Sequence, residues 1–287
     1  MQFLVGVLVC LVVIMAGIMI YDSNRFHKVT YEIVSDRIGE EFRFVFLSDL
    51  HNKQYGRENE KLFAAIDACN PEAVFIGGDV LTASPGESVE PAAQFVKRLA
   101  EKYLIYYANG NHEQRLDLYP ETYGDMGKRY EELLAQVSIR RLVNEAEYNQ
   151  KHNIEIIGCQ IDRRFYKRFK KVPMDGSYLE EILPKKKDGM YTILMAHNPD
   201  YFQAYKEWGA DLTLSGHAHG GVMRLPLLGG VLGTNFRFFP KYDGGMFTED
   251  GKVMIVSRGL GAHTIPLRIF NPAELVEVII KKETKEA

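Results

Sequence analysis

Five short segments of this 287-residue chain carry side chains of the kinds that bind metal ions. In chain order they are Asp49-Leu50-His51, Gly78-Asp79, Gly110-Asn111-His112-Glu113, His197, and Gly216-His217-Ala218-His219. Carboxylate, amide and imidazole ligands without a thiolate suit hard or borderline divalent ions. The segments therefore predict a hydrolytic site that holds two adjacent divalent ions.

Each segment follows an apolar run of the length expected for a buried β-strand. The runs are Phe44–Leu47, Ala73–Ile76, Leu104–Tyr107, Thr192–Met195 and Leu212–Leu214. Ligands delivered from the carboxyl ends of successive strands meet at one edge of a sheet, where open α/β folds bind their ligands. Glycines next to the ligands are predicted to let the backbone turn sharply there, at positions 77, 78, 110 and 216.

The spacing within the segments indicates how the ligands are divided. Residues two apart in an extended segment point the same way, so the pairs at 49–51 and 217–219 are each expected to share a face. Asp79, from another strand, can bridge two ions, and Asn111 adds a neutral oxygen. Considered alone, a Gly-Asp pair is more simply interpreted as a turn, and His197 as a hydrogen-bonded interior histidine. Five such segments in order, each after an apolar run, favour the metal site.

The composition is that of an ordinary globular protein, with 46% apolar and 25% charged residues. A formal net charge of −3 gives no case for a nucleic-acid partner. Of the three cysteines, Cys10 lies in an N-terminal apolar run. The spacing of Cys69 and Cys159 matches no zinc or disulfide framework, so both are predicted to be buried thiols.

The N-terminal residues predict a membrane anchor. Phe3 to Ile20 carries no charge and, at about 1.5 Å per residue, reaches roughly 27 Å as a helix. A cleaved signal peptide is the main alternative, but basic residues before the run and an A-x-A-like site are missing. A soluble core helix is the third interpretation. Arg25 and Lys28 follow the span, which favours a cytoplasmic catalytic domain by the positive-inside rule.

The chain after the anchor is predicted to form one domain. Residues 1–21 are the predicted anchor, 22–41 a tether and first strand, 42–281 the catalytic domain and 282–287 a polar tail. Helical periodicity at 59–69, 92–102, 123–137 and 201–208 alternates with the apolar runs. Further strands are predicted at 30–34, 139–143, 154–158, 252–257 and 275–280. This alternation predicts an α/β fold with two sheets and helices outside them.

The order Asp-x-His, Gly-Asp, Gly-Asn-His-Glu, His, Gly-His-x-His resembles the calcineurin-like metallophosphoesterases from Phe42 almost to the end of the chain. The resemblance implies a four-layered α/β/β/α sandwich in which helices flank two mixed sheets. It implies that His112 is the catalytic histidine, which contacts the phosphoryl or leaving-group oxygen and can act as general acid. The implied ligands are Asp49, His51 and His219 on one metal, Asn111, His197 and His217 on the other, and Asp79 bridging both.

Other motifs resemble a membrane-anchored bacterial phosphodiesterase branch, which includes enzymes that split the pyrophosphate of UDP-2,3-diacylglucosamine. The motifs are Gly220-Gly221, Arg224-Leu225-Pro226, Arg258-Gly259-Leu260-Gly261, Pro266-Leu267-Arg268 and Asn271-Pro272-Ala273-Glu274-Leu275. The branch commonly has Gly-His-Thr-His-Gly-Gly-Gln, where this chain has Ala218 and Val222. Neither is a ligand position, so the difference concerns substrate contacts near Val222.

A mechanism follows from two ions about 3.5–4 Å apart. They share a water or hydroxide whose pKa they lower, and this nucleophile attacks phosphorus in line. The ions and His112 neutralise charge on the phosphoryl oxygens. The ligand types fit manganese, iron or zinc; manganese is preferred here, although affinity order alone favours zinc.

Two stretches bear on the substrate. The segment 163–171 places aromatics among six basic residues, namely Arg163, Arg164, Lys167, Arg168, Lys170 and Lys171. It is either a solvated segment anchored by Phe165 and Phe169 or a patch for anionic lipid headgroups. The apolar, Gly-rich stretch 223–239 is either a core hairpin or a wall that accepts acyl chains.

The sequence thus predicts a membrane-anchored, dinuclear-metal phosphoesterase that hydrolyses phosphodiester or pyrophosphate bonds. A lipid-linked or nucleotide-sugar substrate is the leading hypothesis. A phosphodiesterase or phosphomonoesterase with a soluble target is the alternative, and the anchor argues against a protein phosphatase. A non-catalytic metal-binding scaffold is a further alternative, disfavoured because every expected ligand and His112 are present.

Overall fold

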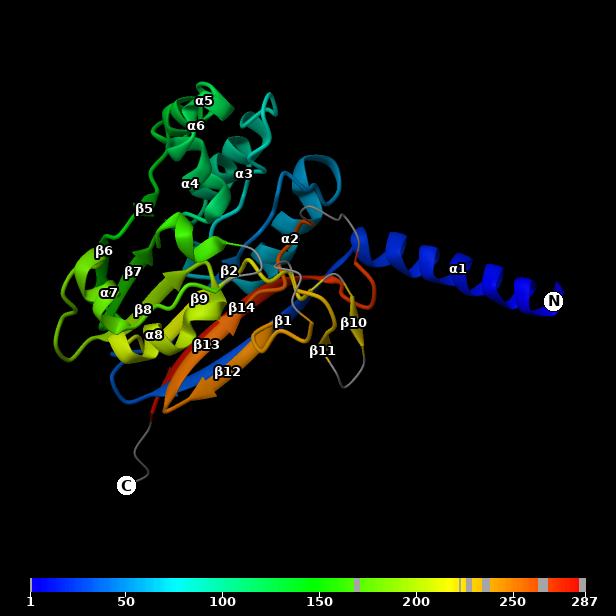
Figure 1. Ribbon diagram of the computed structural model, residues 1–287. Helices are drawn as coiled ribbons and strands as arrows, with labels where there is room; N and C mark the ends of the chain where they lie inside the picture. Colours follow the sequence, from blue (N-terminus) through cyan, green and yellow to red (C-terminus); the bar gives the residue numbers. More distant parts are fainter. Residues whose placement is uncertain are drawn as a thin grey trace.

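Helices flank two packed sheets, in the order helix, sheet, sheet, helix (Figure 1), and the predicted four-layered α/β/β/α sandwich is confirmed. The computed structural model describes residues 2–167, 171–221, 223–225, 229–233, 238–262 and 268–283. The layers follow from the strands themselves: runs that are apolar throughout must be buried on both faces, so each sheet needs a covering layer on either side.

The first sheet has six strands, parallel throughout except where β14 meets β2. In spatial order they are β1 (Phe26–Ser35), β14 (Ala273–Lys282), β2 (Phe42–Leu47), β3 (Ala73–Ile76), β4 (Leu104–Ala108) and β5 (Arg140–Leu142). The last long strand of the chain therefore lies between the first two. β1 and β14 pair over ten residues, so half of the segment predicted as a tether and first strand (22–41) is a strand of the sheet.

The second sheet also has six strands, with antiparallel pairs at its two edges and parallel pairs inside. They are β12 (Gly245–Glu249), β13 (Lys252–Val256), β9 (Leu212–Ser215), β8 (Tyr191–Ala196), β7 (Ile154–Cys159) and β6 (Ala146–Asn149). A separate pair consists of β10 (Arg224–Leu225) and β11 (Gly229–Gly230).

The helices form the two outer layers. On the first sheet lie α2 (Glu60–Cys69), α3 (Glu90–Ala100), α4 (Asn111–Leu118), α5 (Pro120–Tyr123) and α6 (Met126–Leu134). On the second lie α7 (Gly176–Ile182) and α8 (Phe202–Trp208). Three short 3-10 turns are η1 (Arg57–Asn59), η2 (Arg163–Tyr166) and η3 (Pro199–Tyr201).

Three helical regions differ from the prediction. The helix predicted at 123–137 is split, because Gly124 adopts a positive φ of 61° between α5 and α6. No helix is predicted at 176–182, where α7 lies, or at 111–118, where α4 begins directly at the predicted ligand Asn111. Its first turn is closed by Glu113, which accepts a hydrogen bond from Gly110 N at 2.9 Å.

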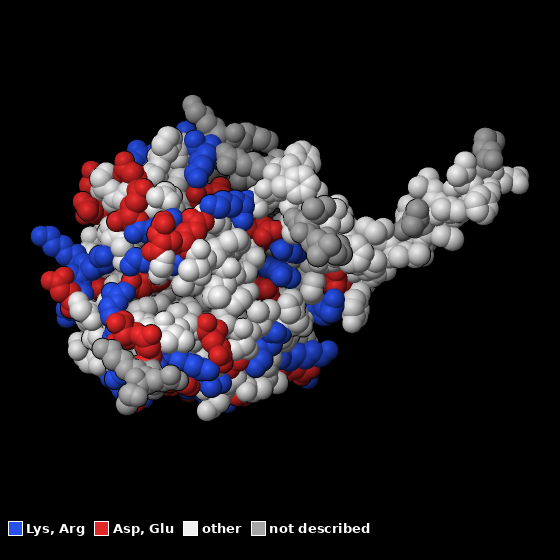
Figure 2. Space-filling view, turned by 90° about the horizontal axis from the view of Figure 1, so that it is seen from below, with Lys and Arg blue, Asp and Glu red and all other residues white. Residues whose placement is uncertain are grey.

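The N-terminal helix α1 (Gln2–Ser23) is long and apolar enough to cross a membrane, and none of its most apolar window is buried in the structure. It projects from the body in Figure 1. Figure 2 shows it as a largely uncharged projection from a surface on which basic and acidic side chains are mixed. A signal sequence near the N-terminus has the same length and composition, but a buried core helix does not fit these exposed side chains.

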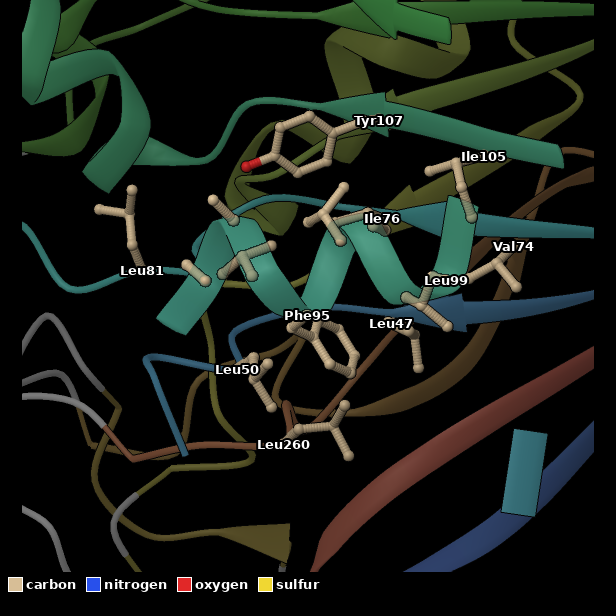
Figure 3. Close-up of a cluster of buried hydrophobic side chains, with 14 of the residues drawn as sticks. Leu47, Leu50, Val74, Ile76, Leu81, Phe95, Leu99, Ile105, Tyr107 and Leu260 are labelled. Carbon is tan, nitrogen blue, oxygen red and sulfur yellow. The ribbon is translucent and has the colours of Figure 1, made fainter. Parts of the chain in front are cut away.

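The core consists of three apolar layers, one between the two sheets and one between each sheet and its helices. Successive side chains of a strand point alternately into the two layers on either side of it. In β3, Val74 and Ile76 face the helices, whereas Ala73 and Phe75 face the other sheet. Figure 3 shows the helix-side layer, where Phe95 and other side chains pack on the first sheet. Cys69 and Cys159 are buried free thiols, as predicted.

Phe75→Ala is expected to lower the free energy of unfolding by about 3–5 kcal/mol. Phe75 is fully buried between the sheets, with its ring 4.3 Å from Phe44 and 4.9 Å from Tyr106, measured between centroids. Urea unfolding followed through the fluorescence of the single tryptophan, Trp208, measures the change. The control is Val34→Ala, at a side chain that is 62% exposed; equal losses in both variants would contradict this account of the core.

Candidate metal centre

The predicted ligands lie at the carboxyl ends of five strands, taken from both sheets. Asp49 and His51 follow β2, Asp79 follows β3, and Asn111 follows β4 in the first sheet. The remaining ligands, His197, His217 and His219, follow β8 and β9 in the second sheet. The strand pattern predicts a site at one edge of a single sheet. The structure instead places the site across the ends of two sheets.

The first group of ligand atoms belongs to Asp49, His51 and His219, and all three atoms lie within 4.8 Å of one another. The Nε2 atoms of His51 and His219 face each other at 3.3 Å, and His219 Nε2 lies 3.1 Å from Asp49 Oδ1. All three residues are buried. One divalent ion between these atoms would satisfy two imidazoles and a carboxylate together.

The second group is formed by Asp79, His197 and His217, again within 4.8 Å. His197 Nε2 lies 3.1 Å from Asp79 Oδ2. Asn111 Oδ1 is buried and has no hydrogen-bond partner among the described residues. Because an unpaired buried amide oxygen is costly, a cation bound at this atom accounts for its position. The donors present thus fit a second ion.

Asp79 lies between the two groups. Its Oδ2 atom is 3.1 Å from His197 Nε2 and 3.9 Å from His51 Nε2. A third set of ligand atoms within 4.8 Å of one another consists of His51, Asp79 and His112. This is where a bridging carboxylate is expected. The structure brings the Asp and His side chains predicted as ligands together, and Asn111 directly follows Gly110, which packs against the Asp79 carboxylate.

The ligand segments are not extended, contrary to the reasoning from residue alternation. The φ angles of Asp49, His51 and Asp79 are 54°, 48° and 54°, and those of His217 and His219 are 63° and 51°. Non-glycine residues rarely adopt this left-handed conformation, and a cluster of them is typical of functional sites. Each pair is therefore brought together by a tight turn and not by strand pleating.

The glycines beside the ligands act mainly through space. Of the four predicted to allow sharp turns, Gly78 alone has a positive φ, at 91°. A Cβ atom on Gly110 would overlap the carboxylate of Asp79, and one on Gly216 would overlap Asp49. These two positions require glycine because the carboxylates approach the backbone closely.

Backbone carbonyls orient two of the imidazoles. His197 Nδ1 donates to Gly77 O at 2.7 Å, and His219 Nδ1 lies 3.4 Å from Gly261 O. Each contact leaves Nε2 directed at the metal centre, which is the usual arrangement around a bound metal. The bond to Gly77 also ties the end of β8 to the end of β3, so it links the two sheets at the site.

His112 is held differently. Its backbone N–H donates to Asp79 Oδ1 at 2.8 Å, and its ring Nδ1 accepts a hydrogen bond from Ala83 N at 2.8 Å. Because Nδ1 is an acceptor, the proton of the neutral ring is on Nε2. His112 thus presents an N–H donor beside the ligands, with its ring centroid 4.9 Å from that of His51.

Two histidines of the second ligand group have pKa values shifted in opposite directions. Burial alone lowers the pKa of His197, but the carboxylates of Asp79 and Asp49 outweigh it and raise that pKa to about 10. Burial, aided by repulsion from His197, lowers the pKa of His217 to about 3. A protonated His197 thus offsets part of the negative charge of Asp79 and Asp49. Metal ligands are deprotonated, so metal binding replaces this proton.

Glu113 is a residue whose role the sequence analysis missed. Its buried carboxylate accepts hydrogen bonds from Asp79 N at 2.8 Å, Val80 N at 2.9 Å and Gly110 N at 2.9 Å. It also accepts one from Tyr107 Oη at 2.9 Å. Burial, with the nearby charge of Asp79, raises its pKa. The signal for this role is a Glu three residues after Gly110, the spacing of a capping box.

The branch motifs near the C-terminus support the first ligand group. Asn271 Nδ2 donates to His219 O and to Gly221 O, both at 2.7 Å. The buried Arg268 guanidinium donates to Arg258 O at 2.8 Å and Gly259 O at 3.1 Å, in the segment that packs on Asp49. Val222, Pro266 and Leu267 lie outside the described residues.

The two stretches singled out for substrate are partly described. Arg168, Phe169 and Lys170 lie outside the described residues, whereas Phe165 is buried, as in the anchored-segment interpretation. In the apolar stretch, residues 226–228 and 234–237 lie outside them as well. Phe238 and Phe239 are 72% and 58% exposed, so these two rings are not part of a core hairpin.

The chain belongs to the calcineurin-like phosphoesterase family, whose model matches residues 42–221. It is 26% identical over 251 residues to an "uncharacterized metallophosphoesterase" of Helicobacter pylori, covering 85% of this chain and 60% of that protein. A zebrafish (Danio rerio) "transmembrane protein with metallophosphoesterase domain" is 28% identical over 88% of this chain and 57% of its own length. The Escherichia coli "phosphodiesterase YaeI" is 25% identical over 66% of this chain and 64% of its own length. The chain spans about 60% of the first relative's length.

Asp79→Ala is expected to reduce the bound metal to less than about one ion per chain, because Asp79 is part of the second ligand group and its Oδ2 atom lies 3.9 Å from His51 Nε2 of the first. Asn111→Ala is expected to weaken only the second ion. Metal content after dialysis, measured by inductively coupled plasma mass spectrometry, tests both. Asp36→Ala, at an exposed carboxylate, is the control; two ions retained in Asp79→Ala would rule out the bridging assignment.

Glu113→Ala is expected to lower the free energy of unfolding by about 3 kcal/mol or more, since it leaves three buried backbone N–H groups without an acceptor. Glu113→Gln keeps one acceptor oxygen and should lose less. Urea unfolding of both variants gives the values, with the exposed Glu121→Ala as control. A Glu113→Ala variant as stable as the control would show that these hydrogen bonds add nothing.

Proposed function

We propose that this chain is a two-metal phosphoesterase that hydrolyses phosphodiester or pyrophosphate bonds. The observation that carries the proposal is the pair of ligand groups that converge on Asp79, with the His112 ring beside them. A site for a single metal ion does not need two ligand groups, and a purely structural metal site does not need an N–H donor beside the ligands.

Each residue has a role in this proposal. Asp49, His51 and His219 hold one ion, while Asn111, His197 and His217 hold the other; Asp79 bridges them. When bound, two such ions activate water and neutralise charge on phosphoryl oxygens. His112 donates from Nε2 to a phosphoryl or leaving-group oxygen, and Ala83 N holds its ring in the tautomer that can donate. Manganese is the proposed metal, with iron and zinc as alternatives for the same ligand set.

The proposed substrate is a lipid-linked or nucleotide-sugar pyrophosphate at a membrane. The helix α1 ends at Ser23 and β1 begins at Phe26, so an anchored chain would hold the site close to the bilayer. The exposed rings of Phe238 and Phe239 offer apolar surface for a lipid chain. Arg25 and Lys28 after the span favour a cytoplasmic face, and the zebrafish relative is named a transmembrane protein.

A phosphodiesterase with a soluble substrate is the second candidate, favoured by the printed name of the Escherichia coli relative. It shares the metal centre and His112 with the first candidate and differs only in what surrounds the phosphoryl group. A non-catalytic scaffold is less well supported, because a scaffold has no need of the donor at His112.

Hydrolysis of bis-p-nitrophenyl phosphate by the full chain in detergent with manganese tests the activity. His112→Ala is expected to lower kcat by about 10²–10⁴-fold with both metals retained, and Asp79→Ala to abolish turnover because the metals are lost. Glu121→Ala serves as control. Two bound metals without turnover in manganese, iron or zinc, on this ester and on UDP-2,3-diacylglucosamine, would favour the scaffold.

A further inference from the structure

Arg163 is a charged side chain with two nitrogens that have no hydrogen-bond partner among the residues that the structure describes. These atoms, Nε and Nη1, are buried and donate to no acceptor within the described part of the chain. Leaving charged donors unpaired in the interior is costly, so buried guanidinium N–H groups normally meet an acceptor. The position of Arg163 therefore calls for an acceptor that the described residues do not provide.

Arg163 lies one aromatic ring away from the second ligand group. Its guanidinium carbon is 5.5 Å from the centroid of the Tyr166 ring. That ring in turn lies 5.3 Å from the ring of His217 and 6.4 Å from that of His197. A single aromatic ring thus links the guanidinium to the imidazoles of the predicted ligands.

Two hydrogen bonds fix this segment against the centre. Gln114 Nε2, from the helix that begins with Asn111, donates to Ile161 O at 2.9 Å. Asn198 Nδ2, next to His197, donates to Phe165 O at 3.2 Å. The turn η2 that carries Arg163 is therefore attached both to α4 and to the end of β8, which flank the second ligand group.

The neighbouring basic residues are used differently. The Arg164 guanidinium stacks 4.8 Å from the ring of Phe165 and 5.4 Å from that of Tyr178. Lys171 Nζ donates to Asp200 O at 2.6 Å. Arg164 and Lys171 thus stabilise the segment itself, whereas two donors of Arg163 are left for a ligand.

We propose that Arg163 forms a phosphoryl-binding subsite next to the second metal position and determines specificity for anionic substrates; this rests on the proposed function. The planar guanidinium, with its fork of N–H donors, matches the oxygens of a phosphoryl group. The bound oxygen belongs either to the phosphorus under attack or to the neighbouring phosphate of a pyrophosphate. Tyr166 supports the guanidinium through its ring face.

The test uses the full chain in detergent with manganese and three variants, Arg163→Gln, Arg163→Lys and the matched control Arg164→Gln. Two substrates are compared, the diester bis-p-nitrophenyl phosphate and the pyrophosphate UDP-glucose. KM and kcat are measured for each, together with metal content and thermal unfolding. Binding of inorganic pyrophosphate by calorimetry gives a readout that does not depend on turnover.

Arg163→Gln is expected to raise KM about tenfold or more and to weaken pyrophosphate binding by a similar factor, with two metals retained. Arg163→Lys keeps the charge without the fork and should lie between the wild type and Arg163→Gln. An effect on UDP-glucose alone assigns the subsite to the neighbouring phosphate, and an equal effect on both substrates assigns it to the phosphorus under attack.

Arg163→Gln with the KM and pyrophosphate affinity of Arg164→Gln would overturn the proposal, even if the enzyme is active. If the wild type hydrolyses neither of these two substrates, calorimetry still decides the subsite independently of the proposed function: pyrophosphate binding that depends on Arg163 supports it. A wild type that does not bind pyrophosphate overturns it.

Discussion

The structure depends on two buried carboxylates, Asp49 and Asp79, that lie almost in contact with imidazoles from the opposite sheet. Buried carboxylates are stable only if nearby cations or donors compensate their charge. Burial alone raises the pKa of Asp49, yet the imidazoles of His219 and His197 outweigh it and lower that pKa. The two sheets are thus joined at the site by charge, in addition to the apolar layer between them.

The same carboxylates explain the unusual backbone around them. Asp49 Oδ1 and Oδ2 accept hydrogen bonds from His217 N at 3.0 and 3.1 Å, and Asp79 Oδ1 accepts one from His112 N at 2.8 Å. N–H groups can point at a carboxylate in this way only if the chain turns tightly. The left-handed residues and the glycines without room for a side chain are the consequence.

Support for the centre extends one layer outward. Glu113 accepts hydrogen bonds from backbone N–H groups of the loop after β3 and of the residue before α4. It thereby fixes the position of Asp79 relative to Asn111. Asn271 does the same for the turn after β9, through His219 O. Rigid support of this kind matters because metal ligands must be held close to their final positions before the ions bind.

The sequence by itself determined which atoms the centre uses and their order along the chain. Strands such as Phe42–Leu47 can be predicted from the sequence because a strand buried on both faces must be apolar throughout. The ability to bind a metal depends on residue type, which the sequence states directly. The family resemblance followed from the same segments and is confirmed. The boundaries of the anchor and tail stay predictions.

Only the tertiary structure decided how these parts meet. The placement of β14 between β1 and β2, the left-handed turn at Asp49 and the need for glycine at 110 all arise from contacts between residues distant in sequence. The unpaired donors of Arg163 are likewise visible only when the surrounding chain is in place. Local patterns encode propensity and residue chemistry, whereas close approach and unsatisfied hydrogen bonds are properties of the packed chain.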